Sequence, residues 1–260
     1  MLRAIAIGID RYQDEKFDDL SCAASDARAV ATLFESRIVP AEREVRLLVD
    51  AQATLRTITI AIDDLSRTVT EDDLVLIYFA GHGCPDRVAA NDRRANYLLS
   101  HDSEYSHIHA TSLGMETHVM DWLKRLSGAR VLTIVLDACF SGGAGGRSVM
   151  GPLLRAARLE TMDSPPVSLK GLNVGRGRGI LCAADDNQLA QEDEATGHGV
   201  FTRHFLASLK RARPGKGVVR ISEIYDEVEE AVRLETNNAQ EPISTLIGNM
   251  RGSLPSLAET

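Results

Sequence analysis

The chain has 260 residues, of which 44% are hydrophobic and only 5% aromatic, so it can build a sizeable core packed mainly by aliphatic side chains. Its formal net charge of −8 argues against a nucleic-acid binder, because phosphate contacts need clustered lysine and arginine. The first apolar stretch is too short for a signal peptide or a membrane helix, and the four cysteines follow no regular spacing. We therefore expect a cytoplasmic protein with reduced thiols and no membrane or nucleic-acid partner.

Strands and amphipathic helices alternate in the first part of the chain. Residues 3–9 read as an apolar strand, and Ser25 can cap a helix over residues 26–38. A second strand is expected over residues 44–50, followed by a helix that starts at Thr54 and carries apolar residues at helical spacing.

The middle of the chain holds two long apolar runs. The first, residues 73–80, is followed by Gly81-His82-Gly83. A polar loop over 84–96, a short fourth strand at 97–100 and a helix over 112–126 are predicted next. A fifth strand then starts at Val131.

This fifth strand ends at Asp137, and Cys139 follows two residues later. Continuous apolar runs are typical of strands buried on both faces of a parallel sheet, whose carboxyl ends meet at the edge where ligands bind. Cys139 and His82 are therefore a candidate nucleophile and general acid/base pair. The alternatives are a buried structural cysteine and a loop histidine with ordinary partners.

The second half begins with residues 141–178, which are rich in glycine, proline and arginine and read as a long flexible excursion. A sixth strand over 179–184, a helix around Phe201 and a helix over 222–236 follow, and the tail from Glu241 reads as irregular. This alternation predicts an α/β fold with a mostly parallel, six-stranded sheet and helices on both faces.

Two motifs, Tyr-Phe-Ala-Gly-His-Gly at 78–83 and Leu-Asp-Ala-Cys-Phe-Ser-Gly at 136–142, resemble the catalytic signatures of caspase-like cysteine proteases. The match is closest to the metacaspase and prokaryotic caspase-like branch. The interval between His82 and Cys139 (139 − 82 = 57 residues) is close to the caspase interval of about 50. The opening strand with Asp26-Ala27, and the stretch from Ala183 to Thr202, also resemble the family, so the resemblance covers nearly the whole chain.

The resemblance implies a three-layer caspase-like sandwich made by one domain, residues 1–260. Residues 1–140 would correspond to the large subunit, 141–178 to the linker and 179–260 to the small subunit. It also implies peptide hydrolysis through an acyl-enzyme on Cys139, with the backbone N–H groups of Gly83 and Cys139 forming the oxyanion hole.

Asp137 directly precedes the cysteine, as in metacaspases, which the resemblance links to cleavage after arginine or lysine. Asp26 and Asp137 are two acids near the same sheet edge, and paired carboxylates suit a guanidinium group. We expect them to line the substrate pocket. The alternatives are a helix-first-turn acid for Asp26 and a strand-end turn acid for Asp137.

The arginines after the catalytic cysteine suggest a self-processing site. If the enzyme cleaves after arginine, Arg147, Arg155 or Arg158 is a candidate, because exposed flexible segments are where proteolytic nicking occurs. The intact segment would then restrain activity until it is cut. Solubilising charges in a loop are an equal alternative.

Metal or cofactor binding is not expected. The remaining cysteines and histidines lack the tight ligand spacing of a zinc site, and the glycine runs at 142–146 and 175–179 match no phosphate-binding motif. Calcium-binding metacaspases carry a longer acidic loop after the histidine. Asp86 and Asp92 are all that this chain has of it, which argues against calcium dependence.

The sequence therefore predicts a cysteine endopeptidase that acts on proteins or peptides after basic residues, with an activating protein partner or linker cleavage as its trigger. By resemblance to prokaryotic relatives, a role in stress or defence follows. The main alternative is a catalytically silent caspase-like interaction module, against which the intact pair of Cys139 and His82 argues. A flavodoxin-like small-molecule binder is disfavoured because no phosphate loop is found.

Overall fold

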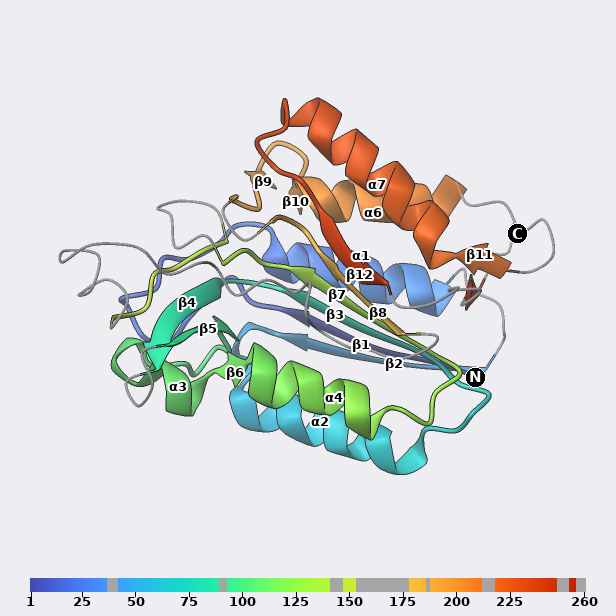
Figure 1. Ribbon diagram of the computed structural model, residues 1–260, viewed down its shortest axis with the longest axis horizontal. Helices are drawn as coiled ribbons and strands as arrows, with labels where there is room; N and C mark the ends of the chain where they lie inside the picture. Colours follow the sequence, from blue (N-terminus) through green and yellow to red (C-terminus); the bar gives the residue numbers. More distant parts are fainter. Residues whose placement is uncertain are drawn as a thin grey trace.

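A six-stranded sheet forms the centre of the computed structural model, which describes residues 1–36, 42–88, 93–140, 147–152, 178–185, 188–211, 218–246 and 253–255 (Figure 1). The strand order is β12-β8-β7-β3-β1-β2. Five neighbouring strands run parallel, and the edge strand β12 pairs antiparallel with β8. Their bounds are β1 Leu2–Gly8, β2 Arg43–Val49, β3 Leu74–Ala80, β7 Val131–Asp137, β8 Arg178–Cys182 and β12 Ile243–Leu246. The predicted α/β fold with a mostly parallel six-stranded sheet is confirmed.

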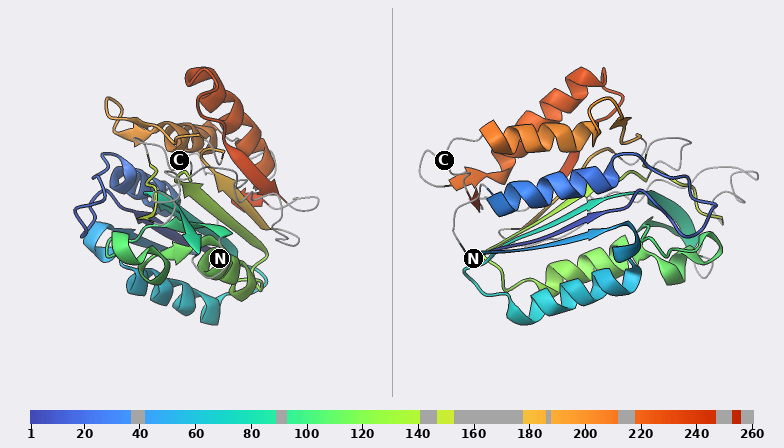
Figure 2. Two further views of the ribbon diagram at one scale, coloured as in Figure 1. Left: turned by 60° about the vertical axis from the view of Figure 1, so that its left-hand side comes forward. Right: turned by 180° about the vertical axis from the view of Figure 1, so that it is seen from behind.

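Helices cover both faces of the sheet, as the front and back views show (Figures 1 and 2). On one face lie α1 (Ala23–Ser36), α6 (Val200–Arg211) and α7 (Ile221–Glu235). On the other lie α2 (Leu55–Thr68) and α4 (Met120–Arg125), the latter preceded by a π-helical turn, Met115–Val119.

The core is divided by the sheet into two apolar clusters. Along β3, Leu76 and Tyr78 point into the cluster beneath α1, whereas Ile77 and Phe79 point into the cluster beneath α2. Because both faces are covered, β3 and β7 are buried over their whole length, which explains their continuous apolar sequences.

The two predicted helix starts have different outcomes. Thr54 caps α2, because its hydroxyl accepts a hydrogen bond from the backbone N–H of Thr57 at 3.1 Å. Ser25 does not cap α1, which already starts at Ala23. The backbone N–H of Ala23 donates to the carboxylate of Asp10 at 2.7 Å, so an acid outside the helix does the capping, and that prediction was wrong.

The predicted loop at 84–96 and the predicted fourth strand of the sheet are also corrected. This stretch is a hairpin of β4 (Gly83–Val88) and β5 (Arg93–Leu98), which pairs with β6 (Leu113–Gly114) in a separate three-stranded sheet. The sixth strand of the main sheet is instead β12, from the tail that was expected to be irregular.

Pro85 explains why the hairpin was missed. Its carbonyl accepts a hydrogen bond from the backbone N–H of Gly151 at 2.9 Å, so the polar backbone groups of Pro85 face away from β5. The missing N–H of proline therefore costs the hairpin no hydrogen bond, and proline is tolerated there.

The remaining described elements are short. They are 3-10 turns at Asp50–Gln52 and Tyr105–His107, α3 (Ile108–Thr111), β9 (Glu192–Asp193), β10 (His198–Gly199), β11 (Val218–Arg220) and β13 (Ser253–Pro255). In the part of the chain that the structure describes, no helix is both long enough and apolar enough to cross a membrane. The carboxyl ends of the parallel strands lie at the left of Figure 1, where β4 also begins.

Candidate active site

The two catalytic candidates follow neighbouring strands of the sheet. In the register between β3 and β7, Ala80 lies opposite Asp137, so the segments carrying His82 and Cys139 leave the sheet side by side. Gly83, the neighbour of His82, packs against the cysteine backbone: a Cβ atom added to Gly83 would lie 2.1 Å from the carbonyl oxygen of Cys139. Only a residue without a side chain allows this approach.

The hydrogen bonds of His82 define which of its ring nitrogens carries the proton. Nε2 lies 2.7 Å from the carbonyl oxygen of Asp18, which can only accept, so Nε2 must donate. Nδ1 is buried and has no hydrogen-bond partner among the described residues. In the neutral ring, Nδ1 therefore holds the free lone pair that a general base needs.

Tyr12 fixes the position of this histidine. Its ring stacks on the imidazole at a centroid distance of 5.0 Å, and its hydroxyl accepts the backbone N–H of His82 at 2.8 Å. Burial lowers the pKa of His82 from its usual 6.5, because the charged imidazolium loses hydration in this environment. The ring is therefore neutral at pH 7.

The backbone N–H groups of Gly83 and Cys139 converge on one acceptor. Both donate to the carbonyl oxygen of Arg147, at 2.9 Å and 3.3 Å respectively. Two N–H groups directed at a single oxygen are the geometry that stabilises an oxyanion. These are the two groups to which the resemblance to caspase-like proteases assigns the oxyanion hole.

The side chain of the same arginine is fully buried against three carboxylates. Its guanidinium lies 2.5 Å from Asp26, 2.8 Å from Asp137 and 3.2 Å from Glu192. We call these three acids the acidic pocket. A planar guanidinium with several donors matches such a ring of carboxylate oxygens. The structure thus brings Asp26 and Asp137 together and adds Glu192.

Backbone and side-chain donors hold the pocket acids in place. Asp26 lies in the first turn of α1 and also accepts from the Nδ1 group of His198 at 2.7 Å and from the N–H of Gly199 at 3.0 Å. Asp137 ends β7 and accepts from the hydroxyl of Thr202 at 2.5 Å. Burial raises the pKa of Asp26 to about 6, and the nearby charge of Arg147 opposes that rise.

Glu192 was missed by the sequence reasoning. It sits on β9, far from the two motifs, and it also accepts the backbone N–H groups of Ser21 and Cys22 at 3.0 Å each. The available signal was the acidic run at 192–194 after the sixth strand.

An open cleft of about 470 Å³ leads to this centre. His82 and Ser148 line it together with several acids, among them Asp18, Glu192 and Glu194. The acidic walls of this cleft favour positively charged segments.

Other candidate residues are buried thiols or lie outside the described residues. The thiols of Cys22 and Cys84 are buried, and burial raises the pKa of both, to about 12 for Cys22. Within the described ranges, no three histidine, cysteine or acidic side chains gather as metal ligands would. Arg155, Arg158 and Asp92 lie outside the described residues, so the structure does not place them.

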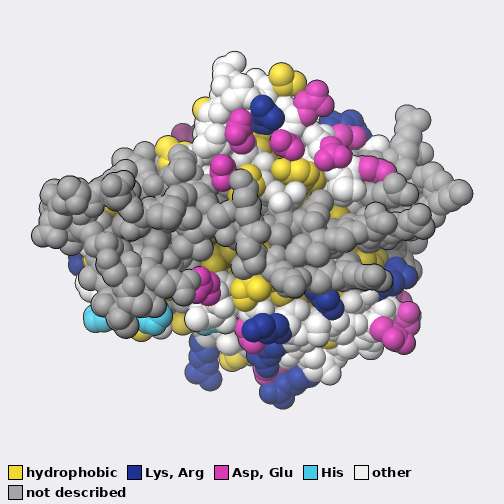
Figure 3. Space-filling model, in the orientation of Figure 1, with side chains coloured by type: hydrophobic (Ala, Val, Ile, Leu, Met, Phe, Trp, Pro, Cys, Tyr) yellow, Lys and Arg dark blue, Asp and Glu magenta, His cyan; other side chains and the backbone are white. Residues whose placement is uncertain are grey.

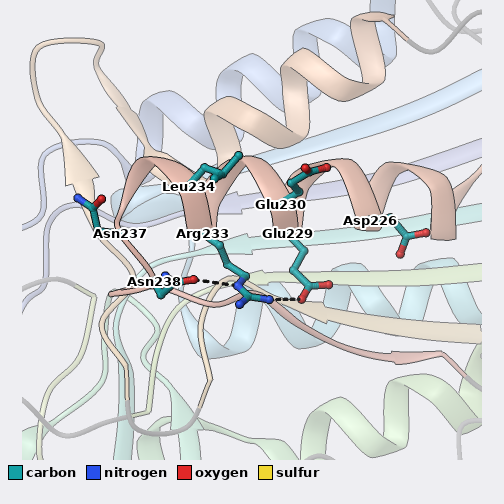
Figure 4. A pocket seen from close by; sticks show the side chains of 7 residues that line it. All are labelled: Asp226, Glu229, Glu230, Arg233, Leu234, Asn237 and Asn238. Atoms are coloured by element: carbon teal, nitrogen blue, oxygen red, sulfur yellow. Dashed lines mark hydrogen bonds and ion pairs between the residues drawn. The ribbon is translucent and has the colours of Figure 1, made fainter.

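A second hollow, of about 410 Å³, lies on α7 and the turn after it (Figure 4). Arg233 crosses it, bonded to Asn238 at 3.1 Å and paired with Glu229 at 3.6 Å, while Leu234 stands exposed beside it. Acidic side chains predominate over this upper part of the visible face (Figure 3). None of the candidate catalytic residues lines this hollow.

Comparison with known proteins identifies the architecture. The family model described as caspase domain matches residues 1–248. The protein GSU0716 from Geobacter sulfurreducens superposes with a TM-score of 0.70 at 17% identity, covering 98% of this chain and 97% of its own. Caspase-1 from Spodoptera frugiperda superposes with a TM-score of 0.61 at 13% identity, covering 98% and 88%. At these identities the superpositions show the fold alone. Among curated proteins, no match was found.

Proposed function

Because this chain belongs to the caspase domain family, we propose that it is a cysteine endopeptidase that hydrolyses peptide bonds after arginine or lysine, like the metacaspase branch. One observation supports this above all others: Arg147 occupies the site as a substrate residue would. Its guanidinium lies in the acidic pocket, and its carbonyl oxygen accepts from the two N–H groups of the proposed oxyanion hole.

The acylation step follows from this arrangement. Nδ1 of His82 takes the thiol proton of Cys139 while Sγ attacks the carbonyl carbon of the substrate arginine. The developing oxyanion is held by the N–H groups of Gly83 and Cys139, and one such donor typically contributes about 3 kcal/mol. When the intermediate collapses, the C–N bond breaks and His82 returns the proton to the leaving amine.

Hydrolysis of the thioester completes the cycle. Water gives one proton to Nδ1 of His82 and adds to the acyl carbon, with the same two N–H groups stabilising the second oxyanion. The C–S bond then breaks, and His82 returns its proton to Sγ, which restores the Cys139 thiol and the neutral imidazole. Overall, one water is consumed and one peptide bond becomes a carboxylate and an amine.

We further propose that the protein is made as a zymogen and that the bond between Arg147 and Ser148 is its own first substrate. Of the three linker arginines singled out in the sequence, Arg147 is the one that the structure describes, and it fills the pocket completely. While this bond is intact, no other arginine can enter. A cut there would separate the large-subunit-like residues from the rest of the linker.

The proposal is tested with fluorogenic peptides that end in arginine, lysine or aspartate, using wild type and Cys139→Ala, with and without calcium. Hydrolysis after arginine that is lost in Cys139→Ala supports the nucleophile and the acidic pocket. If the protein hydrolyses only the aspartate peptide, the acidic pocket is not the binding site for the substrate side chain. No hydrolysis of any peptide, even after deliberate cutting of the linker, would favour the alternative of a silent interaction module.

A further inference from the structure

The chain beyond Arg147 continues as an added strand on β4. Ser148 forms a parallel bridge with Gly83, and the backbone N–H of Val149 donates to the carbonyl of Gly83 at 2.9 Å. Two residues later, the N–H of Gly151 donates to the carbonyl of Pro85 at 2.9 Å. We call residues 147–151 the docked segment. These hydrogen bonds join backbone atoms, so they do not depend on which side chains the segment carries.

Among the described residues, β4 presents this side to the docked segment alone. Its opposite edge is taken by β5, in the register that places Cys84 opposite Tyr97. Pro85 offers an acceptor but no donor, so the ladder lacks the one hydrogen bond that its N–H would have given. Backbone hydrogen bonds therefore hold an added strand more firmly at the carbonyl of the scissile bond than further along. Weaker binding beyond that bond suits a fragment that must dissociate after cleavage.

Two further contacts hold the docked segment close to the core of the protein. The hydroxyl of Tyr105 donates to the carbonyl of Met150 at 3.2 Å. The side chain of Val149 packs against the core cluster on the α2 side of the sheet. The segment is therefore seated in a groove rather than lying across the surface.

The fourth position after the scissile bond is the most restricted. A Cβ atom added to Gly151 would lie 2.3 Å from Cγ and 2.4 Å from Cβ of Asp86, and Asp86 is itself buried. Contacts below 3 Å cannot be accommodated without moving the strand, because a packed buried side chain has little room to retreat.

From these contacts we propose that β4 is the docking strand for the substrate residues that follow the scissile bond, and that Asp86 selects glycine at the fourth of them. This specificity rests on the proposed endopeptidase function. The docked segment is the first occupant of the groove, and substrates in extended conformation take its place once it has been cut and released.

Hydrolysis of matched peptides tests whether the protein selects glycine at the fourth position of a separate substrate molecule. The peptides share one sequence up to arginine and continue as Ser-Val-Met-Gly, Ser-Val-Met-Ala or, as a control, Ser-Val-Ala-Gly. In wild type, alanine at the fourth position should lower kcat/KM on the order of tenfold, whereas the control should stay within about threefold. Asp86→Gly removes the side-chain atoms that an alanine Cβ at the fourth position would contact. In this variant, kcat/KM for the glycine peptide should exceed that for the alanine peptide by only about twofold.

Hydrogen exchange tests the docking without any catalysis. In uncut Cys139→Ala protein, the N–H groups of Val149 and Gly151 should be protected. Adding Gly151→Ala should speed exchange of residues 148–151 on the order of tenfold, and adding Met150→Ala should not.

The two readouts separate the possible failures. Equal hydrolysis of the glycine and alanine peptides would overturn the selection and leave the endopeptidase function standing. Hydrolysis of no peptide, with the segment protected as expected, would refute the endopeptidase function and leave β4 as a strand-docking surface. Unprotected N–H groups at Val149 and Gly151 would overturn the docking, and unchanged exchange in Gly151→Ala would overturn the selection, whatever the peptides show.

Discussion

Replacing Asp26 with asparagine removes one charge from the acidic pocket with almost no change in shape. Asp26 is fully buried and lies 2.5 Å from the guanidinium of Arg147. Removing one partner of a buried ion pair costs about 3–5 kcal/mol when the other charge is left alone. Here Asp137 at 2.8 Å and Glu192 at 3.2 Å still face the guanidinium, so we expect about 2 kcal/mol.

At about 1.4 kcal/mol per tenfold, this loss predicts a fall of about 30-fold in kcat/KM for peptides cleaved after arginine. The assay compares arginine with citrulline, which has the same shape without the charge. Each protein is assayed after intact-mass measurement shows that its own bond after Arg147 has been cut. Hydrolysis after citrulline should change by less than about threefold in Asp26→Asn.

A matched control removes an acid beside the pocket. Asp193 neighbours Glu192 on β9 but pairs with Arg203 at 3.8 Å instead of the pocket arginine. Asp193→Asn should therefore keep the preference for arginine over citrulline. Two results would show that the acidic pocket does not recognise the substrate charge and that the reasoning is wrong. Asp26→Asn could cleave after arginine as fast as wild type, or its kcat/KM could fall equally for the arginine and citrulline peptides.

Three further predictions concern the reaction centre and the acidic pocket. Gly83→Ala should abolish measurable hydrolysis while the fold is retained, because its Cβ would lie 2.1 Å from the carbonyl oxygen of Cys139 and displace the oxyanion donors; near-native kcat with a native circular dichroism spectrum would contradict the role of this N–H. In the pH profile, kcat should fall only below about pH 6.5, because burial lowers the pKa of His82 and the ring can accept a proton only while neutral. KM for arginine peptides should rise below about pH 6, because burial raises the pKa of Asp26 to about 6 and its protonated form no longer attracts the guanidinium. A KM that is flat from pH 7 to pH 5 would argue against Asp26 as a pocket charge.

Residues whose role follows from their own strand were predictable. The apolar runs of β3 and β7 fixed where His82 and Cys139 leave the sheet, and parallel pairing then placed them at one edge. Glu192 was not predictable in this way, because it reaches the pocket from β9, a two-residue strand whose position depends on tertiary packing.

Contacts made by backbone atoms could not be predicted from the sequence either. The sequence marks Pro85 as a strand breaker, and only its pairing with the docked segment shows why it is tolerated in β4. Among the linker arginines, nothing in the sequence distinguished Arg147 from Arg155 or Arg158. The distinction comes from the fold, which lays Arg147 across the ends of β3 and β7.

The central claim is that this chain is a cysteine endopeptidase whose own Arg147 lies in the site as a substrate. Intact-mass measurement of purified wild type and Cys139→Ala, incubated side by side at pH 7.5, tests it most directly. The account predicts that wild type separates into fragments 1–147 and 148–260 while Cys139→Ala stays whole. A wild-type chain that stays uncut, and that hydrolyses no arginine peptide, would contradict it.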